Sequence, residues 1–380
     1  MKSNIISILR KLKILFFFDY LRKIRFFYLR NHFPYLKLDF TSAVVKVRNV
    51  SDIDEQLYDR MFKSVRSELG YEPTGLWTDI FDEYQADAVR LIKEGNKDGL
   101  LKMLQSPLSN NIQYGFDNLA KVLQSNFRLE TINEAKTTSD HFLALGEYTL
   151  ASRYFSPEGL VSPLKERVDI NKIVNKIVNS VFNGKCIFPN PYIGERGMAT
   201  EYGIASIRTP AAIYQSIRVL DLGKNICEIG PGLGRTAYFS KLLGAQRYTL
   251  VDLPIPSLCQ SYFLGTSLPN ETFIYNHETS KNQKAIKFQQ PESFLNDNEK
   301  YDVILNVDSL TEMGADAAKT YLRNFIGKSD WLLSINHEGN EFTVREIASE
   351  LNEYTLISRS RSWVRLGYVE ELYKIEKSSQ

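Results

Sequence analysis

A short apolar stretch that runs into three closely spaced glycines is the feature that most constrains this chain. Residues 225–229 are mostly apolar, as in a buried parallel strand, and Gly230, Gly232 and Gly234 follow directly. Glycine lets the backbone turn tightly against a ligand before a helix begins. A second apolar stretch ends in Asp252, about 20 residues further on, where a carboxylate accepts hydrogen bonds from ribose hydroxyls. Strand, glycine loop, helix, strand and acid together predict a nucleotide-type cofactor site.

The spacing of the glycines distinguishes two classes of cofactor. A dinucleotide site has the pattern G-x-G-x-x-G, and this chain has Arg235 where the third glycine would stand. Glu228, two residues before the first glycine, fits poorly beside a pyrophosphate but well beside the cationic groups of S-adenosylmethionine. We therefore predict that Glu228, the three glycines, Arg235 and Asp252 bind S-adenosylmethionine. Asn306, at the end of a later strand, completes this set of cofactor-binding candidates.

The pattern E-x-G-x-G-x-G resembles motif I of class I methyltransferases, and Asp252 stands where their ribose-binding acid would be. Strands and helices alternate from about residue 221 onward, which predicts a Rossmann-like doubly wound sheet over residues 185–380. The closing pair, at 354–358 and 369–375, is expected to be antiparallel. Either 273–276 or 285–288 should supply the strand after Asp252, and the sequence leaves that choice open. Residues 41–184 are predicted to form a mainly helical cap beside the substrate cleft.

Residues 1–40 form a basic, aromatic-rich arm. They contain nine Lys or Arg and two Asp, although the whole chain has a net charge of only +2. The longest apolar run, 14–18, is far shorter than the roughly 20 residues that span a bilayer, and no signal-peptide cleavage site follows it. Peripheral membrane contact and packing on the protein or a partner chain both remain open. Nucleic acid is not the expected partner.

Three cysteines are too few and too scattered for a disulfide framework or a zinc cluster. They favour a reducing, cytoplasmic location, with the inner face of the cytoplasmic membrane as the alternative if the arm binds lipid.

Polar residues follow two later strands, at 306–312 and 336–338. Methyl transfer to a hydroxyl needs a base, and His337 is the first choice because its ordinary pKa lies near working pH. Asp308 is the alternative base, and Glu312 is a third catalytic candidate. The other histidines, His32, His141 and His277, are expected to lie outside this group. Asp308 and Glu312 could hold Mg²⁺ together with Glu338, but the spacing does not demand a metal.

The glycine motif and the string Asp-Ser-Leu-Thr-Glu-Met at 308–313 together resemble a bacterial family of sugar O-methyltransferases. That family is associated with surface-polysaccharide gene clusters, and the resemblance covers roughly residues 185–380. It implies methylation of a sugar hydroxyl on a nucleotide sugar, a lipid-linked glycan or a chain end.

Three alternatives stay open at this point. One is a methyltransferase for nitrogen or for another small molecule. The second is a nicotinamide-dependent sugar oxidoreductase, which Arg235 disfavours. The third is a non-enzymatic scaffold that keeps the cofactor fold.

Overall fold

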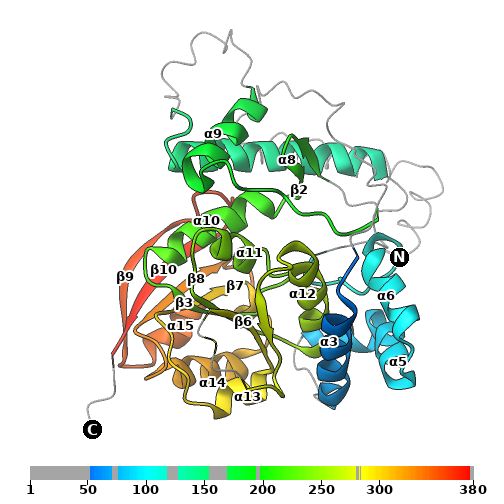
Figure 1. The fold of residues 1–380 in the computed structure, drawn as a ribbon. Coiled ribbons are helices and arrows are strands. Elements are labelled where there is room, and N and C mark those ends of the chain that lie inside the picture. The colour runs from blue at the N-terminus through cyan, green and yellow to red at the C-terminus, as the bar shows by residue number, and fades with distance from the viewer. Residues whose placement is uncertain are drawn as a thin grey trace, which may run out of the picture.

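The computed structural model describes residues 52–70, 76–117, 127–153, 169–193, 197–279, 282 and 284–376 (Figure 1). The basic arm at residues 1–40 lies outside this described part, so the alternatives for it stay predictions. No helix among the described residues is long and apolar enough to cross a membrane.

The described residues form an eight-stranded sheet in the order β5-β6-β4-β3-β7-β8-β10-β9. Neighbouring strands from β5 to β8 are parallel, whereas β10 runs antiparallel to both β8 and β9. This arrangement confirms the predicted fold class, including the antiparallel closing pair. Both candidate stretches after Asp252 are strands, and the second one, β6, is the neighbour of β4. The strands are β3 (Asn225–Ile229), β4 (Arg247–Val251), β5 (Thr272–Ile274), β6 (Ala285–Gln289), β7 (Val303–Val307), β8 (Trp331–Asn336), β9 (Tyr354–Arg361) and β10 (Val369–Ile375).

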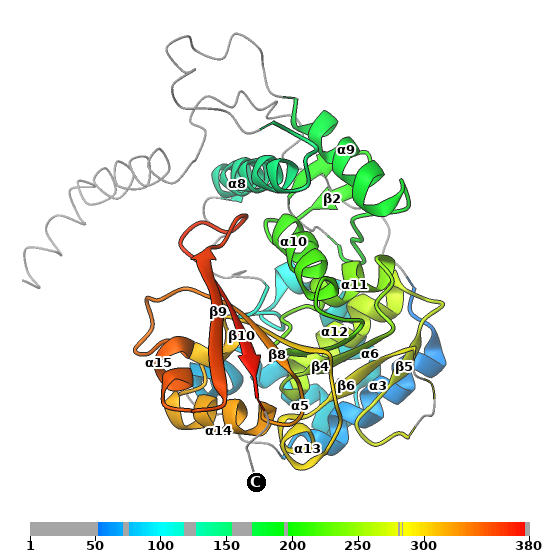
Figure 2. The ribbon, with the colours of Figure 1, turned by 90° about the vertical axis from the view of Figure 1, so that its left-hand side faces the viewer.

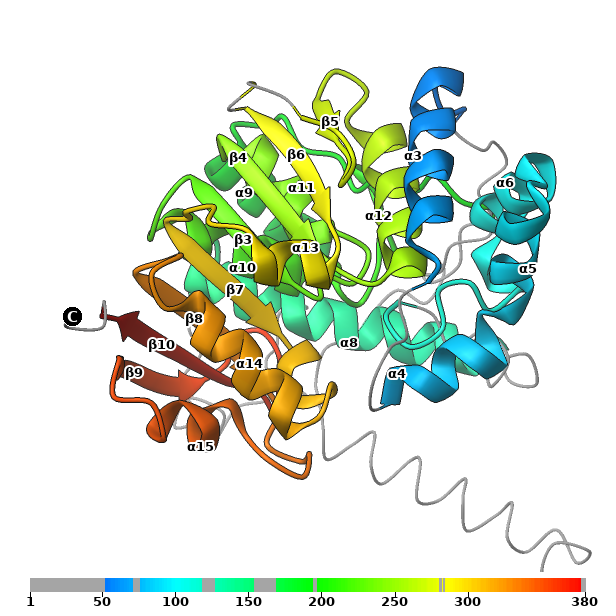
Figure 3. The same ribbon diagram turned by 90° about the horizontal axis from the view of Figure 1, so that it is seen from below.

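Helices cover both faces of the sheet because successive strand residues point to opposite sides. In β3, Ile226 belongs to a core shared with the helices α10, α11 and α12, whereas Cys227 and Ile229 belong to a second core with α13, α14 and α15 (Figures 2 and 3). Side chains that alternate between two cores in this way fix the register of a strand. The six helices are α10 (Thr209–Leu220), α11 (Arg235–Leu242), α12 (Pro254–Ser267), α13 (Pro291–Asn296), α14 (Ala315–Phe325) and α15 (Val344–Ser349).

The described residues before 185 are mainly helical, as predicted for this region. Its described elements are α3 (Glu55–Glu68), α4 (Leu76–Asp79), a π-helix at Ile80–Tyr84, α5 (Ala86–Glu94), α6 (Lys97–Gln105), a 3₁₀ turn at Pro107–Ser109, α8 (Phe127–Tyr148) and α9 (Ile170–Phe182). Helix α3 begins where the Asp54 side chain accepts a hydrogen bond from the Leu57 amide, at 2.8 Å. A two-stranded hairpin of β1 (Met198–Thr200) and β2 (Gly203–Ala205) connects this region to α10.

The helical part and the sheet share one of the two hydrophobic cores. Leu57 of α3 packs over Gly265 of α12, where a Cβ atom would lie 2.7 Å from the leucine side chain. Phe142 of α8 and Val174 of α9 belong to the same core as Ile226 of the sheet. The helical part is therefore packed against the helices on one face of the sheet, and a few of its residues reach the cavity at the carboxyl ends of the strands. The boundaries at residues 40 and 184 remain predictions.

Candidate active site

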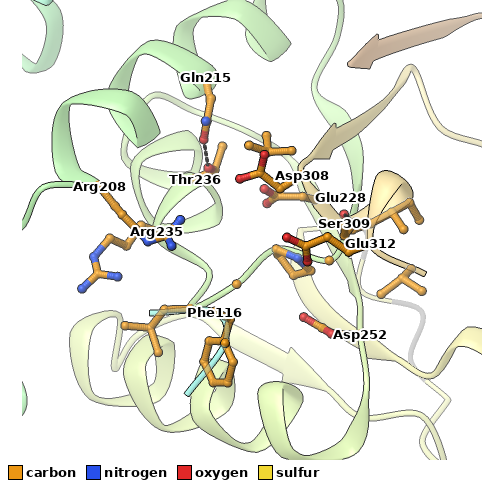
Figure 4. Close-up of a pocket in the computed structure, with 18 of the residues that line it drawn as sticks. Phe116, Arg208, Gln215, Glu228, Arg235, Thr236, Asp252, Asp308, Ser309 and Glu312 are labelled. Carbon is orange, nitrogen blue, oxygen red and sulfur yellow. Dashed lines mark hydrogen bonds between the residues drawn. The ribbon is translucent and has the colours of Figure 1, made fainter. Parts of the chain in front are cut away.

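A cavity of about 340 Å³ lies at the carboxyl ends of β3, β4 and β7 and is covered by residues of the helical part (Figure 4). This is the position where open α/β sheets bind their ligands, and the volume is in the range of small-molecule sites. The wall on the sheet side includes Glu228, the glycine loop, Asp252, Asp308 and Glu312. Trp77, Phe116, His141 and Arg208 also line the cavity.

All three glycines of the loop have a left-handed backbone, with φ of +65° at Gly230, +59° at Gly232 and +84° at Gly234. That conformation disfavours any residue with a Cβ atom. At Gly230 there is also no room, since a Cβ would lie 2.3 Å from the side chain of Ser309. At Gly232 the nearest atom to a Cβ would be the Phe116 carbonyl oxygen, 3.7 Å away. The loop therefore faces the cavity as bare backbone.

Glu228, the last but one residue of β3, lines the cavity with its carboxylate almost fully buried. Its Oε2 accepts a hydrogen bond of 2.6 Å from the hydroxyl of Tyr248. Burial raises the pKa of Glu228 to about 7, although the hydrogen bond from Tyr248 partly offsets this rise. A cation in the cavity would favour the ionised form of this group.

Asp252, directly after β4, also lines the cavity. Its Oδ1 accepts from the Leu253 amide at 2.8 Å, and its Oδ2 accepts from Nε2 of Gln260 at 2.6 Å. Gln260 Nε2 also donates to the carbonyl oxygen of Gly232, at 2.9 Å, so one amide group connects the acid to the glycine loop. Burial raises the pKa of Asp252 to about 7.

Arg235 opens helix α11 and is 8% exposed. Its guanidinium pairs with Asp117 of the helical part and lies 5.6 Å from the centre of the Phe263 ring. The residue in the position of the dinucleotide glycine thus attaches the helical part to the glycine loop. On the other side of the loop, Thr236 donates a 2.7 Å hydrogen bond to Gln215 of α10, drawn as a dashed line in Figure 4.

Asn306 does not line the cavity. It is fully buried, and its Nδ2 donates to the Ile229 carbonyl at 3.2 Å and to Ser309 Oγ at 2.6 Å. Its Oδ1 accepts from Asn336 at 3.1 Å. The side chain therefore connects the ends of β3, β7 and β8, and this geometry gives it a positioning role rather than direct contact with a ligand.

Asp308 is the most unusual residue of the site. It has φ of +68°, a conformation that is strained for a residue with a Cβ atom. Its Oδ2 accepts from Arg365 Nη1 at 2.8 Å and from the Tyr368 hydroxyl at 3.2 Å. Its Oδ1 is buried and accepts no hydrogen bond from any described residue. Such an orphaned oxygen beside a cavity is able to accept a hydrogen bond from a ligand.

Glu312 follows the 3₁₀ turn Ser309–Thr311 and also lines the cavity. Burial and then the charge of Asp308 raise the pKa of Glu312. Glu338, the third acid considered for Mg²⁺, instead forms a bidentate pair with Arg359, at 2.8 and 2.9 Å. Within the described ranges, no three His, Cys, Asp or Glu residues are grouped in a way that could hold a metal ion. The described geometry thus gives no support to a metal shared by the three acids.

The two histidines of interest lie differently from the prediction. His337 does not line the cavity; its ring meets that of Tyr368 edge-on at 5.5 Å, and its Nδ1 accepts from the Gly339 amide at 3.2 Å. His141, expected to lie apart, lines the cavity from α8 and is 8% exposed. That expectation was wrong because the helical part folds over the strand ends. The only signal in the sequence is the polar stretch Thr138 to His141 inside a helix.

No protein-family description and no curated protein matches the chain. Solved methyltransferase structures are similar to part of it. The magnesium protoporphyrin IX methyltransferase of Synechocystis PCC 6803, with bound S-adenosylmethionine, is 15% identical, covers 44% of this chain and 78% of its own, and has a TM-score of 0.32. The ribosomal protein L11 methylase of Lactobacillus delbrueckii subsp. bulgaricus is 13% identical over 44% and 78%, with a TM-score of 0.33. A proposed RNA methyltransferase of Pyrococcus horikoshii is 15% identical over 46% and 84%, with a TM-score of 0.32. Similarity at this level does not establish activity, cofactor or acceptor.

Proposed function

We propose that the chain is an S-adenosylmethionine-dependent methyltransferase that methylates a sugar hydroxyl, in the synthesis of bacterial surface glycans. The observation that supports this cofactor is a pair of acids, the buried Glu228 and the half-buried Asp252, which line one cavity together with a left-handed glycine loop. Glu228 would face the cationic methionine part of the cofactor, and Asp252 would accept from its ribose hydroxyls. When bound, S-adenosylmethionine supplies an electrophilic methyl group.

One of these acids, Glu228, argues against a nicotinamide dinucleotide. Its buried carboxylate beside the glycine loop would repel a pyrophosphate, whereas an acid at the position of Asp252 is common to both kinds of site. The guanidinium that could offset it, on Arg235, is already paired with Asp117. A hydride-transfer enzyme is therefore the weaker candidate.

Asp308 is our proposed base. Its Oδ1 would take the proton of the acceptor hydroxyl, while the bound cofactor would supply the methyl group and retain the electron pair of the broken sulfur–methyl bond. Arg365 and Tyr368 hold the other carboxylate oxygen and so fix the direction of the orphaned one. A base positioned in this way contributes roughly 10²- to 10⁴-fold to the rate. His141, on the cavity wall, replaces His337 as the second candidate.

The sugar acceptor rests on two supports. One is the resemblance carried by residues 308–313, and the other is the mixed character of the cavity wall. Trp77 and Phe116 lie 6.4 Å apart in stacked orientation and offer an apolar surface, while Asp308 and Glu312 offer hydrogen-bond acceptors. Sites that pair a few polar groups with aromatic side chains suit ligands with hydroxyl groups and apolar faces.

The cofactor is tested by calorimetric titration of the full chain with S-adenosylmethionine, S-adenosylhomocysteine and NAD. We expect binding of the first two and not of NAD, and loss of binding in Glu228→Gln and Asp252→Asn. Asp330→Asn is the matched control, because Asp330 is exposed and precedes β8 at the opposite edge of the sheet. Unchanged binding in both site variants would overturn the assignment.

The acceptor is tested separately by mass analysis of the host's glycans after loss of the gene, where one methyl increment should disappear. The Asp308→Asn variant should bind the cofactor normally and fail to restore the methyl group. Restoration by Asp308→Asn but not by His141→Gln would move the role of base to His141. Unchanged glycan methylation after gene loss would overturn the sugar acceptor.

We place the reaction in the cytoplasm, since three free, buried cysteine thiols suit a reducing compartment. Peripheral membrane contact through residues 1–40 is testable with anionic liposomes, to which a chain without these residues should bind less. Equal liposome binding by the full and shortened chains would leave packing as the role of the arm.

A further inference from the structure

We propose that the acceptor carries an anionic group, a phosphate or a carboxylate, and that Arg208 binds this group. The inference rests on the proposed function and names the class of sugar that the site takes. It starts from the distribution of charge along the cavity wall, where Arg208 and Arg235 lie on one side and Glu228, Asp252, Asp308 and Glu312 lie on the other (Figure 4).

Three arginines line the cavity, and two of them have a carboxylate of their own. Arg235 pairs with Asp117, and Arg365 pairs with Asp308 at 2.8 Å. For Arg208, the nearest carboxylate among the described residues is again Asp117, with Nε and Oδ1 3.8 Å apart. Its side chain is 43% exposed, and its 3.8 Å separation from Asp117 is longer than a hydrogen bond. Arg208 is thus the cation of this wall that a ligand can reach.

A small recess opens beside Arg208. The recess shares Ile207, Arg208 and Arg235 with the main cavity, and Gln113 forms part of its wall. Gln113 is 2% exposed, and its Nε2 has no acceptor among the described residues. Asp117, on the same wall, is committed to Arg235, and Glu134 has a partner of its own.

The junction of cavity and recess therefore offers donors that lack acceptors. A ligand that binds at this junction must supply oxygen acceptors. An anionic ligand gains the most binding energy, because hydrogen bonds between ionised partners are about twice as strong as neutral ones. A neutral sugar would instead cover the Arg208 charge without pairing it, which is unfavourable.

The position of Arg208 also suits a bound sugar. Asp308, the proposed base, and Arg208 lie on different sides of the cavity (Figure 4). One molecule could present its reacting hydroxyl to Asp308 and an anionic substituent to Arg208. Sugar phosphates, nucleotide diphosphate sugars and uronic acids have this combination, whereas neutral sugars do not.

The test is calorimetry on the full chain saturated with S-adenosylhomocysteine. Glucose 1-phosphate, glucuronate, inorganic pyrophosphate and neutral glucose are titrated in turn. We expect at least one anion to bind roughly tenfold or more tightly than glucose, and the order of glucose 1-phosphate and glucuronate tells phosphate from carboxylate. Arg208→Gln should lower anion affinity at least about tenfold, and Arg208→Lys should retain part of it.

The matched control is Arg90→Gln, because Arg90 lies on the surface of α5 with only exposed acids as partners. If Arg208→Gln does not fold, Gln113→Met serves instead and should also weaken anion binding. Equal anion affinity in wild type and variant, or no binding of any anion, overturns the inference. Binding of S-adenosylhomocysteine is measured first, so its failure refutes the proposed function independently of the anion site.

Discussion

Replacing Gly230 by alanine should destabilise the protein by an amount that follows from two separate effects. The residue has φ of +65°, and a left-handed conformation costs a residue with a Cβ atom about 1–2 kcal/mol. The new Cβ would also lie 2.3 Å from Ser309 Cβ and Oγ, far inside contact distance. Ser309 Oγ donates to the Ile229 carbonyl at 2.8 Å and accepts from Asn306 at 2.6 Å. Moving it away would disturb two hydrogen bonds, each worth about 1 kcal/mol.

We therefore expect Gly230→Ala to lower the free energy of unfolding by about 3–4 kcal/mol, as the sum of the conformational and hydrogen-bond effects. The matched control is Gly244→Ala, because Gly244 has φ of +96° and no atom of another residue lies within 4 Å of the place its Cβ would take. That variant should lose only about 1–2 kcal/mol. Urea unfolding followed by circular dichroism measures both.

The steric contribution of Ser309 to the loss of stability is isolated by adding Ser309→Gly to the Gly230→Ala variant. The two substitutions should be coupled by more than about 1 kcal/mol, since the glycine removes the atoms that the alanine meets. If the two alanine variants lose the same stability, or if the pair is additive, the close approach of Ser309 does not hold the loop and the reasoning fails.

Three further predictions follow from burial and charge. Burial raises the pKa of Glu228 and Asp252 to about 7, so in the ligand-free fold both acids bind protons below that pH. The affinity for cationic S-adenosylmethionine should therefore rise as the pH increases through about 7. A calorimetric affinity that stays flat across this pH range would contradict the prediction. Asp117→Asn removes the negative charge that pairs with the buried Arg235 guanidinium and should destabilise by about 3–5 kcal/mol in thermal unfolding. Asp87→Asn, in an exposed pair, should change stability by at most about 1 kcal/mol. Burial raises the pKa of Cys186 to about 12, so maleimide labelling of the folded chain should be slow and should become fast only in denaturant.

The strands and the glycine loop could be predicted because their signals are local. Apolar runs, glycine spacing and a terminal acid are read within about 30 residues, the length of one strand-helix-strand unit. Glu228 and Asp252 both lie on the cavity wall, as that reasoning requires. The mainly parallel sheet with helices on both faces also agrees, because strands that alternate with helices favour this architecture.

The residues that line the cavity from the helical part could not be predicted from such local signals. His141 and Phe116 reach the cavity from the helical part, far from the glycine loop in sequence. His337 had the right chemistry and the right strand end, but its ring turns to Tyr368. Asn306 likewise ends a strand at the correct edge, yet its amide is used to connect neighbouring strands. The position of a residue at a strand end therefore does not predict its role unless the direction of its side chain is also known.

Arg235 shows how the two sides of the site depend on each other. In a dinucleotide loop, the residue at the position of Arg235 is a glycine, which lets the helix and the strand pack closely. Here Gly234, one residue earlier, makes the close approach instead, with a Cβ position 3.1 Å from Leu264 and 3.3 Å from Leu250. The next residue is then free to carry a long side chain, and its guanidinium binds Asp117 of the helical part. Arg235 therefore both departs from the dinucleotide pattern and attaches the cover of the cavity, so in our proposal the residue that favours S-adenosylmethionine also places the residues that would select the acceptor.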